Sequence, residues 1–413
     1  MSKISPLLDR LEKIAKTDIR YFISGNFWLT FSRATSILSG FILTTALANL
    51  LARSTYGFLD YAMALSSTLS AFSLIGLGTA ITNGVARGDD GVLRESFIKS
   101  VKWGLAGTVI AFGMAIFYFL HHDIQTGSAL LMIAVSGPVM ATGNYKSFLV
   151  GKKDFKALSL YSIPRTYIPL IAMVVTAAID PSPLAIVAAY FASNMFASAL
   201  VYFDVIRRYK VPRKAKDLQG IMHFAKHTTI IGFLSQISSQ LDQLLVWHFM
   251  GADSVAIYSL ATSPVEELKN IPANIFNMAI PKYAARRDED LRHVVWQKMK
   301  QLFIIVAVVA FIYIVAAPFV FTVLFPKYIV SIAYTRIYAL VLLFQPQGFV
   351  DAMLIAKENI PLRRTLTIVN QLIKLVLLTV GIAYFGIWGG IGALMASEAV
   401  NLVTFSAALA RVK

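Results

Sequence analysis

Basic side chains interrupt three long apolar stretches in the first half of the chain. Arg33 lies about half-way through the first stretch, and Lys146 and Arg165 lie in two later ones. An ionised group at the bilayer centre costs about 3 kcal/mol or more, so such residues are functional candidates. Cations that face one cavity would bind an anion, because a guanidinium can hold two phosphate oxygens at once. The alternative for Lys146 and Arg165 is that they reach the headgroups of the cytoplasmic surface.

Acidic side chains occupy comparable positions in the second half. Asp242, Glu266 and Glu398 lie deep in apolar stretches, where binding of a proton or sodium could drive a conformational cycle. The second interpretation is that Glu266, Glu267 and Lys269 pair with each other, with Lys374 and Glu398, or with water in the cavity. The sequence leaves both interpretations open.

The composition indicates a membrane protein. Of 413 residues, 57% are hydrophobic and only 15% are charged, whereas a soluble domain carries about 25% charged residues. This balance excludes a soluble globular enzyme and a disordered chain. The chain has no cysteine, which excludes disulfides, thiolate zinc sites, iron–sulfur clusters and cysteine nucleophiles.

The apolar stretches predict an all-α polytopic membrane protein. A helix needs about 20 apolar residues to cross the hydrocarbon core. About twelve stretches satisfy that length, and they lie near Phe22–Ala48, Phe58–Asn83, Val101–Leu120, Gly127–Val150, Leu158–Ile179, Leu184–Asp204, Ala225–Phe249, Val255–Pro281, Gln301–Phe325, Tyr334–Ala356, Thr365–Phe385 and Gly389–Ala410. Prolines interrupt several of them, which favours kinked helices around a cavity.

The distribution of Lys and Arg predicts the orientation. Of 38 such residues, 30 lie at the termini or in alternate connections, so both termini are expected to be cytoplasmic. Residues 1–20 are predicted to form a cytoplasmic amphipathic segment on the membrane lipids. The net charge of +16 is therefore a topology signal, and no nucleic-acid partner is expected.

A weak internal repeat divides the chain in two. At an offset of 199 residues, Ala80-Ile81 matches Ala279-Ile280, and Ala86-Arg87 matches Ala285-Arg286. Six spans separate the copies, so both have the same orientation and form a parallel repeat. We expect two six-helix lobes around a central cavity, at residues 21–205 and 225–413, joined by a basic cytoplasmic loop at 206–224.

This architecture is typical of a transporter. The expected outer connections are short, which disfavours the alternative of a membrane polymerase or ligase of lipid-linked sugars. No GxxxxGK[ST] sequence is present, so ATP does not bind through a P-loop. His223 and His227 lack the glutamate of a zinc-binding HExxH motif. We expect no metal and no cofactor, apart from a coupling proton or sodium ion.

Two short motifs resemble a known family. Residues 51–58, with the sequence LARSTYGF, are similar to the LAR…(Y/F)G signature of Wzx-type flippases, in the multidrug/oligosaccharidyl-lipid/polysaccharide exporter superfamily. Asp242, Gly251 and residues 255–258 resemble that family's seventh and eighth spans. Ala256 departs from the family's usual glycine.

The resemblance implies a substrate and partners. The substrate would be an undecaprenyl-diphosphate-linked oligosaccharide of O-antigen or a related polysaccharide, moved to the periplasmic leaflet of the bacterial inner membrane. A polymerase and a chain-length regulator would be partners. Arg53, within the signature, joins Arg33, Arg165 and Lys146 as a candidate substrate-binding residue. A cation-coupled multidrug exporter of the same fold is the alternative. It should carry acidic residues in its cavity, and the cations of the first lobe disfavour it.

Overall fold

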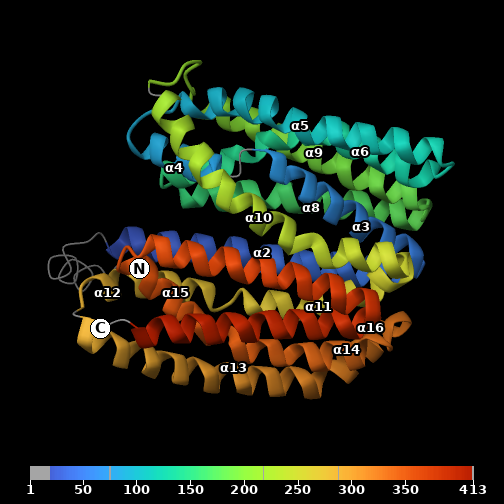
Figure 1. Cartoon of the computed structure of the whole chain (residues 1–413). Coiled ribbons are helices and arrows are strands. Elements are labelled where there is room, and N and C mark those ends of the chain that lie inside the picture. Colours follow the sequence, from blue (N-terminus) through green and yellow to red (C-terminus); the bar gives the residue numbers. More distant parts are fainter. Residues whose placement is uncertain (1–18, 74–75, 217, 287, 412–413) are drawn as a thin grey trace, which may run out of the picture. The chain divides into compact units, whose positions relative to one another are not determined.

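The computed structural model describes residues 19–73, 76–216, 218–286 and 288–411 of the chain. The predicted amphipathic segment at residues 1–20 lies almost wholly outside these described residues. The regular elements of the described residues are helices. The chain divides into two compact units (Figure 1), residues 1–47 with 69–229 and residues 48–68 with 230–413.

Long helices with apolar sequences build the first unit. Its elements are most of α2 (Ile19–Leu50), η1 (Ser70–Phe72), α4 (Leu77–Ala86), α5 (Val92–Leu120), α6 (Ile124–Met140), η2 (Ala141–Asn144), α7 (Tyr145–Gly151), α8 (Phe155–Ile179), α9 (Pro183–Arg208) and the start of α10 (Leu218–Met250). Helix α6 packs against α5 and α9, and α8 packs against α9. The buried core includes Ile81, Leu93, Phe148 and Val201.

Aspartate side chains cap the N-termini of two of these helices. The Asp123 side chain accepts from the Thr126 amide at the start of α6, and the Asp154 side chain accepts from the Ala157 amide at the start of α8. Such caps satisfy amides that have no partner within the helix. The Tyr209 hydroxyl donates to the other Asp154 oxygen across 2.6 Å. Burial and this carboxylate raise the pKa of Tyr209, so the hydroxyl keeps its proton and ties the end of α9 to α8.

The second unit contains helices from both halves of the sequence. Its elements are α3 (Arg53–Leu69), most of α10, α11 (Ala252–Lys269), α12 (Ala273–Ala284), α13 (Asp288–Leu324), η3 (Pro326–Tyr328), α14 (Ser331–Tyr338), η4 (Ala339–Gln347), α15 (Gly348–Ala356) and α16 (Ile360–Arg411). Tyr258, Tyr338, Leu342, Phe349 and Leu378 belong to its buried core. Helix α11 packs against α14, and α15 packs against α12 and α16.

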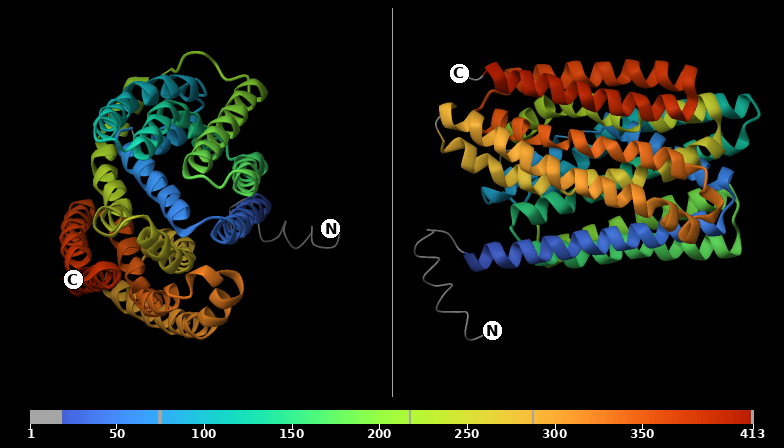
Figure 2. Two further views of the ribbon diagram at one scale, coloured as in Figure 1. Left: turned by 90° about the vertical axis from the view of Figure 1, so that its right-hand side faces the viewer. Right: turned by 90° about the horizontal axis from the view of Figure 1, so that it is seen from below.

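Helix α16 consists of two helices joined at a sharp break. Gly386 has φ +58° and ψ −138°, a backbone conformation that glycine adopts at little cost. The two halves then run side by side (Figure 2). A Cβ on Gly389 would lie 1.8 Å from the Gly381 carbonyl oxygen, so the approach requires glycine. The break falls between the two predicted apolar stretches, Thr365–Phe385 and Gly389–Ala410.

The helix bounds repeat at the offset found in the sequence. Helix α3 begins at residue 53 and α11 at residue 252, a separation of 199 residues, and each is followed by a break and a shorter helix, α4 or α12. Gly57 of α3 packs directly on α11, where its Cβ would lie 1.8 Å from the Ala252 carbonyl oxygen. The nitrogen of Ala256, the residue 199 positions after Gly57, lies 3.1 Å from the same point.

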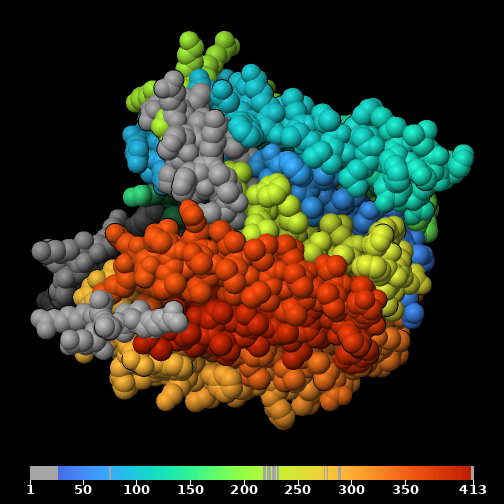
Figure 3. Space-filling view, in the orientation of Figure 1, coloured from blue at the N-terminus to red at the C-terminus, as the bar shows by residue number. Residues whose placement is uncertain are grey.

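The helices have the length and surface of membrane spans. In the described residues, eight helices are long and apolar enough to cross a membrane, and nine when the bent pair of Arg53–Phe72 and Leu77–Ala86 counts as one span. Large apolar side chains are exposed along α5 and α13, including Val109, Phe112, Phe311 and Phe319. In Figure 3 the two halves of α16, coloured orange-red to red, lie side by side on the face toward the viewer. A water-soluble protein rarely exposes such apolar faces.

Two boundaries differ from the sequence expectation. Residues 48–68 join the second unit, although they belong to the first half of the sequence. Helix α9 extends to Arg208 and α10 begins at Leu218, so the connection is shorter than the predicted loop at 206–224. Hydropathy marks only the apolar part of a helix, whereas the backbone hydrogen bonds continue equally well through its basic ends.

Candidate functional site

Arg165 holds a positive charge that its partner does not neutralise. It lies on α8, one residue after Pro164, and its guanidinium donates to Oδ1 of Asn194 on α9. The Asn194 amide nitrogen donates in turn to the Tyr190 carbonyl across 2.8 Å, which orients its oxygen toward Arg165. The Arg165 Nε atom is buried and has no acceptor among the described residues. The side chain can therefore accept a further anionic partner.

Arg33 approaches the same helix. The Ser32 hydroxyl on α2 donates to the Ser162 hydroxyl on α8 across 2.9 Å, and the Ser159 hydroxyl donates to the Trp28 carbonyl. These bonds join α2 to α8 within the first unit. Arg33 follows Ser32 directly, and Arg165 lies three residues, about one turn, beyond Ser162. The two predicted arginines therefore come from helices that are in contact, and Arg33 is half-buried.

Lys146 lies on the short helix α7, and its side chain is partly exposed. The positive charge of Arg165 acts on both Lys146 and its neighbour Tyr145. The two cations therefore belong to one electrostatic environment within the first unit. Tyr145 is buried, and its hydroxyl has no partner among the described residues.

Arg53 belongs to the second unit, separate from the other three predicted substrate-binding cations. It is the first residue of α3, and its guanidinium carbon lies 5.8 Å from the centre of the Tyr328 ring. A cation over an aromatic face is a stabilising contact. Its substrate-binding role stays a prediction.

The second unit brings two of the predicted acids to one lysine. The Lys269 ammonium lies 3.0 Å from Glu266 Oε1 and 3.1 Å from Glu398 Oε1. Glu266 is on the same helix as Lys269, and Glu398 comes from α16. The pairing interpretation of these charges is therefore correct for Glu266 and Glu398. One ammonium between two carboxylates leaves the triad with a net negative charge when all three groups are ionised.

Tyrosine hydroxyls donate to two of the predicted acids, one inside the triad and one outside it. The Tyr258 hydroxyl donates to Asp242 Oδ2 across 2.8 Å, and the Tyr338 hydroxyl donates to Glu266 Oε1. The charges of Lys374 and Glu266 both act on Asp242. Asp242 Oδ1 is buried without a donor among the described residues. Tyr258 lies within the motif at residues 255–258, but neither it nor Tyr338 was assigned a role, because an aromatic residue in an apolar stretch ordinarily signals packing.

Amides complete the polar network around Glu398. The Gln347 side chain donates to Glu398 Oε2 across 2.8 Å, and Asn401 donates to the same oxygen across 3.3 Å. Further along, Arg363 donates to both oxygens of Asp351, at 2.7 and 3.1 Å. This ion pair ties α15 to the start of α16.

Asp60 is a buried acid within the predicted span Phe58–Asn83, and it was assigned no role from the sequence. It lies on α3, is 6% exposed and faces Ser259 of α11. One of its oxygens has no donor among the described residues. Because α3 belongs to the second unit, this carboxylate joins the acid-bearing unit rather than the cationic one.

Metal ligands do not gather in the part of the chain that the structure describes. Among these residues, no group of three or more His, Asp or Glu side chains could hold a metal ion. The side chains of His223 and His227 lie outside the described ones.

Comparison with known proteins identifies related sequences and folds. A family model described as "Polysaccharide biosynthesis protein" matches residues 46–339. A search of curated proteins finds no matching sequence.

Several solved structures resemble the chain along its length. An inward-facing multidrug resistance MATE family transporter of the MOP superfamily is 15% identical, with a TM-score of 0.69 over 94% of this chain and 98% of that one. The lipid II flippase MurJ, in an inward closed conformation, is 15% identical, with a TM-score of 0.70 over 94% and 87%. A MOP superfamily transporter from Pyrococcus furiosus is 13% identical, with a TM-score of 0.58 over 95% and 96%. The fold is therefore that of the MOP superfamily.

Proposed function

Because the chain belongs to the Polysaccharide biosynthesis protein family, we propose that it is a flippase for lipid-linked oligosaccharides. The substrate is an undecaprenyl-diphosphate-linked repeat unit of O-antigen or a related surface polysaccharide. It moves from the cytoplasmic to the periplasmic leaflet of a bacterial inner membrane by alternating access. The polyprenyl chain stays in the lipid while the protein carries the charged, sugar-bearing headgroup.

The unneutralised Arg165 guanidinium is the observation that carries this proposal. A diphosphate cannot cross hydrocarbon unaided, and the first unit holds Arg165 on a neutral amide with a buried Nε atom left to donate. Arg33 comes from the adjoining helix, and Lys146 shares the electrostatic environment of Arg165. Two guanidinium groups and one ammonium suit the dispersed negative charge of a diphosphate.

A span count of twelve completes the proposed topology. Counting the two halves of α16 separately, and adding α10 and the pair α11–α12, extends the nine candidate spans to twelve. An even number of spans agrees with two cytoplasmic termini. Helices α10 and α11 contain Asp242, Glu266 and Lys269, which lower their hydropathy where the proposed coupling residues lie.

We assign coupling to the acids of the second unit. A proton or sodium ion that binds Asp242, or that displaces Lys269 from Glu266 and Glu398, changes the net charge of the network. A change of charge in a buried network biases its packing between two conformations. A polysaccharide polymerase and its chain-length regulator are the proposed partners on the outer leaflet.

The charge of the first unit favours this function over multidrug export. The fold does not separate the two, because the lipid II flippase and the multidrug transporter resemble the chain about equally. A cationic drug would be repelled by Arg165 and Lys146, whereas a diphosphate would be attracted.

Reconstitution in liposomes tests the proposal. Undecaprenyl-diphosphate-linked oligosaccharide is placed in one leaflet, and its appearance in the other is measured by an impermeant glycosidase, with and without proton and sodium gradients. The same liposomes are assayed for uptake of a fluorescent cationic drug. We expect transfer of the lipid-linked sugar alone. Drug uptake without sugar transfer would identify a multidrug exporter, and elongation of the oligosaccharide would identify a polymerase.

A further inference from the structure

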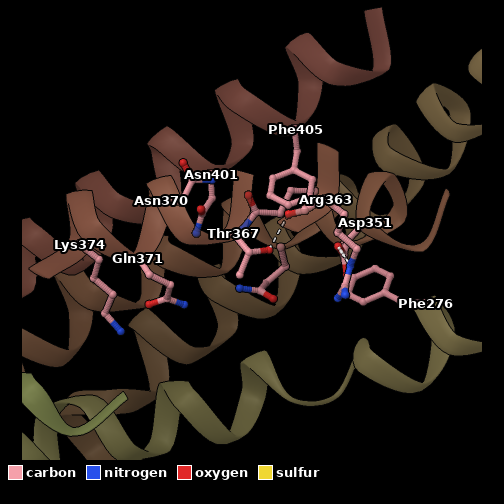
Figure 4. A pocket seen from close by; sticks show the side chains of 12 residues that line it. Phe276, Asp351, Arg363, Thr367, Asn370, Gln371, Lys374, Asn401 and Phe405 are labelled. Atoms are coloured by element: carbon pink, nitrogen blue, oxygen red, sulfur yellow. Dashed lines mark hydrogen bonds and ion pairs between the residues drawn. The ribbon is translucent and has the colours of Figure 1, made fainter. Parts of the chain in front are cut away.

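A polar cavity in the second unit has no role in the mechanism proposed above. It has a volume of about 260 Å³, close to the lower end of small-molecule pockets, about 300 Å³. Figure 4 shows that Gln371 and Lys374 lie toward one end and Asp351, Arg363 and Phe276 toward the other. Its lining is rich in side-chain amides, which come from Gln345, Gln347, Asn370, Gln371 and Asn401.

Three of these lining amides have buried acceptor atoms. Gln347 Oε1, Asn370 Oδ1 and Gln371 Oε1 are buried and have no donor among the described residues. Asn370 as a whole is only 6% exposed. A buried acceptor without a donor costs about 1–3 kcal/mol, so three in one cavity indicate a ligand with several hydrogen-bond donors.

Bonds on the nitrogen side fix the orientation of two of the amides. Gln347 turns its nitrogen toward the Glu398 carboxylate, which can only accept while it is ionised. Asn370 donates to the Thr404 hydroxyl across 2.9 Å, and that hydroxyl donates to the Asn401 carbonyl across 3.1 Å. Reversing Gln347 would set its oxygen against the Glu398 carboxylate, so the Gln347 oxygen is held as an acceptor, and the Asn370 orientation keeps both bonds of Thr404.

The charges around the cavity favour a neutral ligand over a cation. Arg363 and Asp351 neutralise each other through two hydrogen bonds. Lys374, whose charge also acts on Asp242, is the other cation in the lining. An ammonium ligand could donate to the three amides but would be repelled by Lys374, whereas hydroxyl groups donate without that penalty.

Two phenylalanines supply an apolar surface beside the amides. Phe276 and Phe405 both line the cavity. The Phe276 ring packs directly on Gly348, where a Cβ would lie 2.3 Å from the ring. Phe349 contacts the same ring edge-on, with the ring centres 5.0 Å apart. A pyranose ring has hydroxyls around its edge and C–H groups on its face, so it matches acceptors beside an aromatic ring.

We propose that this cavity binds one neutral sugar ring of the transported oligosaccharide. The identity of the ligand as part of a lipid-linked substrate rests on the proposed function. The amide oxygens of Gln347, Asn370 and Gln371 accept from sugar hydroxyls, and Phe276 packs on the ring face. The cavity is thus a glycan subsite in the second unit, distinct from the diphosphate-binding cations of the first.

The test compares substrates with and without sugar. The full-length protein is placed in nanodiscs, which avoid sugar-headed detergents, and titrated with undecaprenyl-diphosphate-linked oligosaccharide and with bare undecaprenyl diphosphate. Gln371→Met removes one acceptor at nearly constant volume, and Phe276→Leu removes the ring as a second variant. Gln301→Met, on the exposed surface of α13, is the matched control. Saturation-transfer NMR with methyl glycosides of neutral hexoses detects sugar binding without any lipid.

We expect Gln371→Met and Phe276→Leu each to weaken binding of the oligosaccharide lipid about fivefold, as for the loss of one contact. Both variants should bind bare undecaprenyl diphosphate as the wild type does. Unchanged oligosaccharide binding in both variants would overturn the glycan subsite and leave the diphosphate site intact. Methyl-glycoside signals that depend on Gln371, without binding of either lipid, would instead uphold the subsite and overturn the proposed lipid-linked substrate.

Discussion

Gln347 donates its side-chain amide to Glu398 Oε2 across 2.8 Å and also lines the polar cavity of the second unit, with its oxygen left without a donor among the described residues. The same side chain therefore touches the proposed glycan subsite and the carboxylate network proposed for ion coupling. A sugar that binds the Gln347 oxygen polarises the amide that donates to Glu398. Substrate binding and the charge state of the network are linked through this residue.

Replacing Gln347 by methionine should break that link. The variant keeps a similar volume but removes both the acceptor for sugar and the donor to Glu398. We expect lipid-linked oligosaccharide to stimulate proton or sodium flux in wild-type proteoliposomes and to have a several-fold smaller effect in the variant. Gln301→Met is the control, and equal stimulation in all three proteins would contradict a role for Gln347.

Lys269 should be the most costly single residue to remove from the network. Lys269→Met leaves Glu266 and Glu398 without their shared cation, and breaking a partly buried pair of this kind costs about 3 kcal/mol. Thermal unfolding in detergent measures the loss. The control is Lys300→Met, an exposed lysine on α13.

The double variant Lys269→Met with Glu398→Gln supplies a further check on the same network. It should recover part of the lost stability, because the second change removes one of the two unbalanced charges. Equal melting temperatures for Lys269→Met and Lys300→Met would show that the triad does not stabilise the fold.

Gly57 should tolerate no side chain. Gly57→Ala places a Cβ 1.8 Å from the Ala252 carbonyl oxygen, so α3 and α11 must separate and lose packing. We expect a clear fall in melting temperature. Gly104→Ala on α5 is the matched control, since nothing lies within 4 Å of its Cβ and alanine favours a helix. A fall of the same size in both variants would refute the close contact.

Arg165 should bind the diphosphate through the two parallel donors of its planar guanidinium as well as through its charge. Arg165→Gln removes the charge, and Arg165→Lys keeps it while losing the two parallel donors. We expect binding of bare undecaprenyl diphosphate to decrease in the order wild type, lysine variant, glutamine variant. The exposed Arg292→Gln on α13 should bind like the wild type. A lysine variant equal to the wild type would mean that charge alone suffices.

The sequence predicted the periodic features of this fold well. The duplication at offset 199 anticipated the matching starts of α3 and α11, and the separate apolar stretches that end at Phe385 and begin at Gly389 anticipated the break in α16. Both features depend on local residue types: small residues where backbones approach and glycine where φ is positive. The sequence did not predict that residues 48–68 pack with the second unit, because packing between helices distant in sequence leaves no local pattern.

The candidate sites were only partly accessible from the sequence. Charges in apolar stretches identified Arg165, Asp242, Glu266 and Glu398, because an ionised side chain there is conspicuous. Their neutral partners were not identified, since Asn194 and Gln347 resemble ordinary polar residues until a fold brings them to a charge. The amide-lined cavity was not predicted for the same reason, since its residues come from four separate elements.

The most direct test of the account compares the initial rate of transfer of undecaprenyl-diphosphate-linked oligosaccharide by wild type and Arg165→Gln. Both proteins are reconstituted at equal density in the same liposomes, with Arg292→Gln beside them. The account predicts that the wild type and Arg292→Gln transfer the lipid at equal rates and that Arg165→Gln loses at least nine-tenths of the activity, about 1.4 kcal/mol or more. Transfer by Arg165→Gln at the wild-type rate would contradict it.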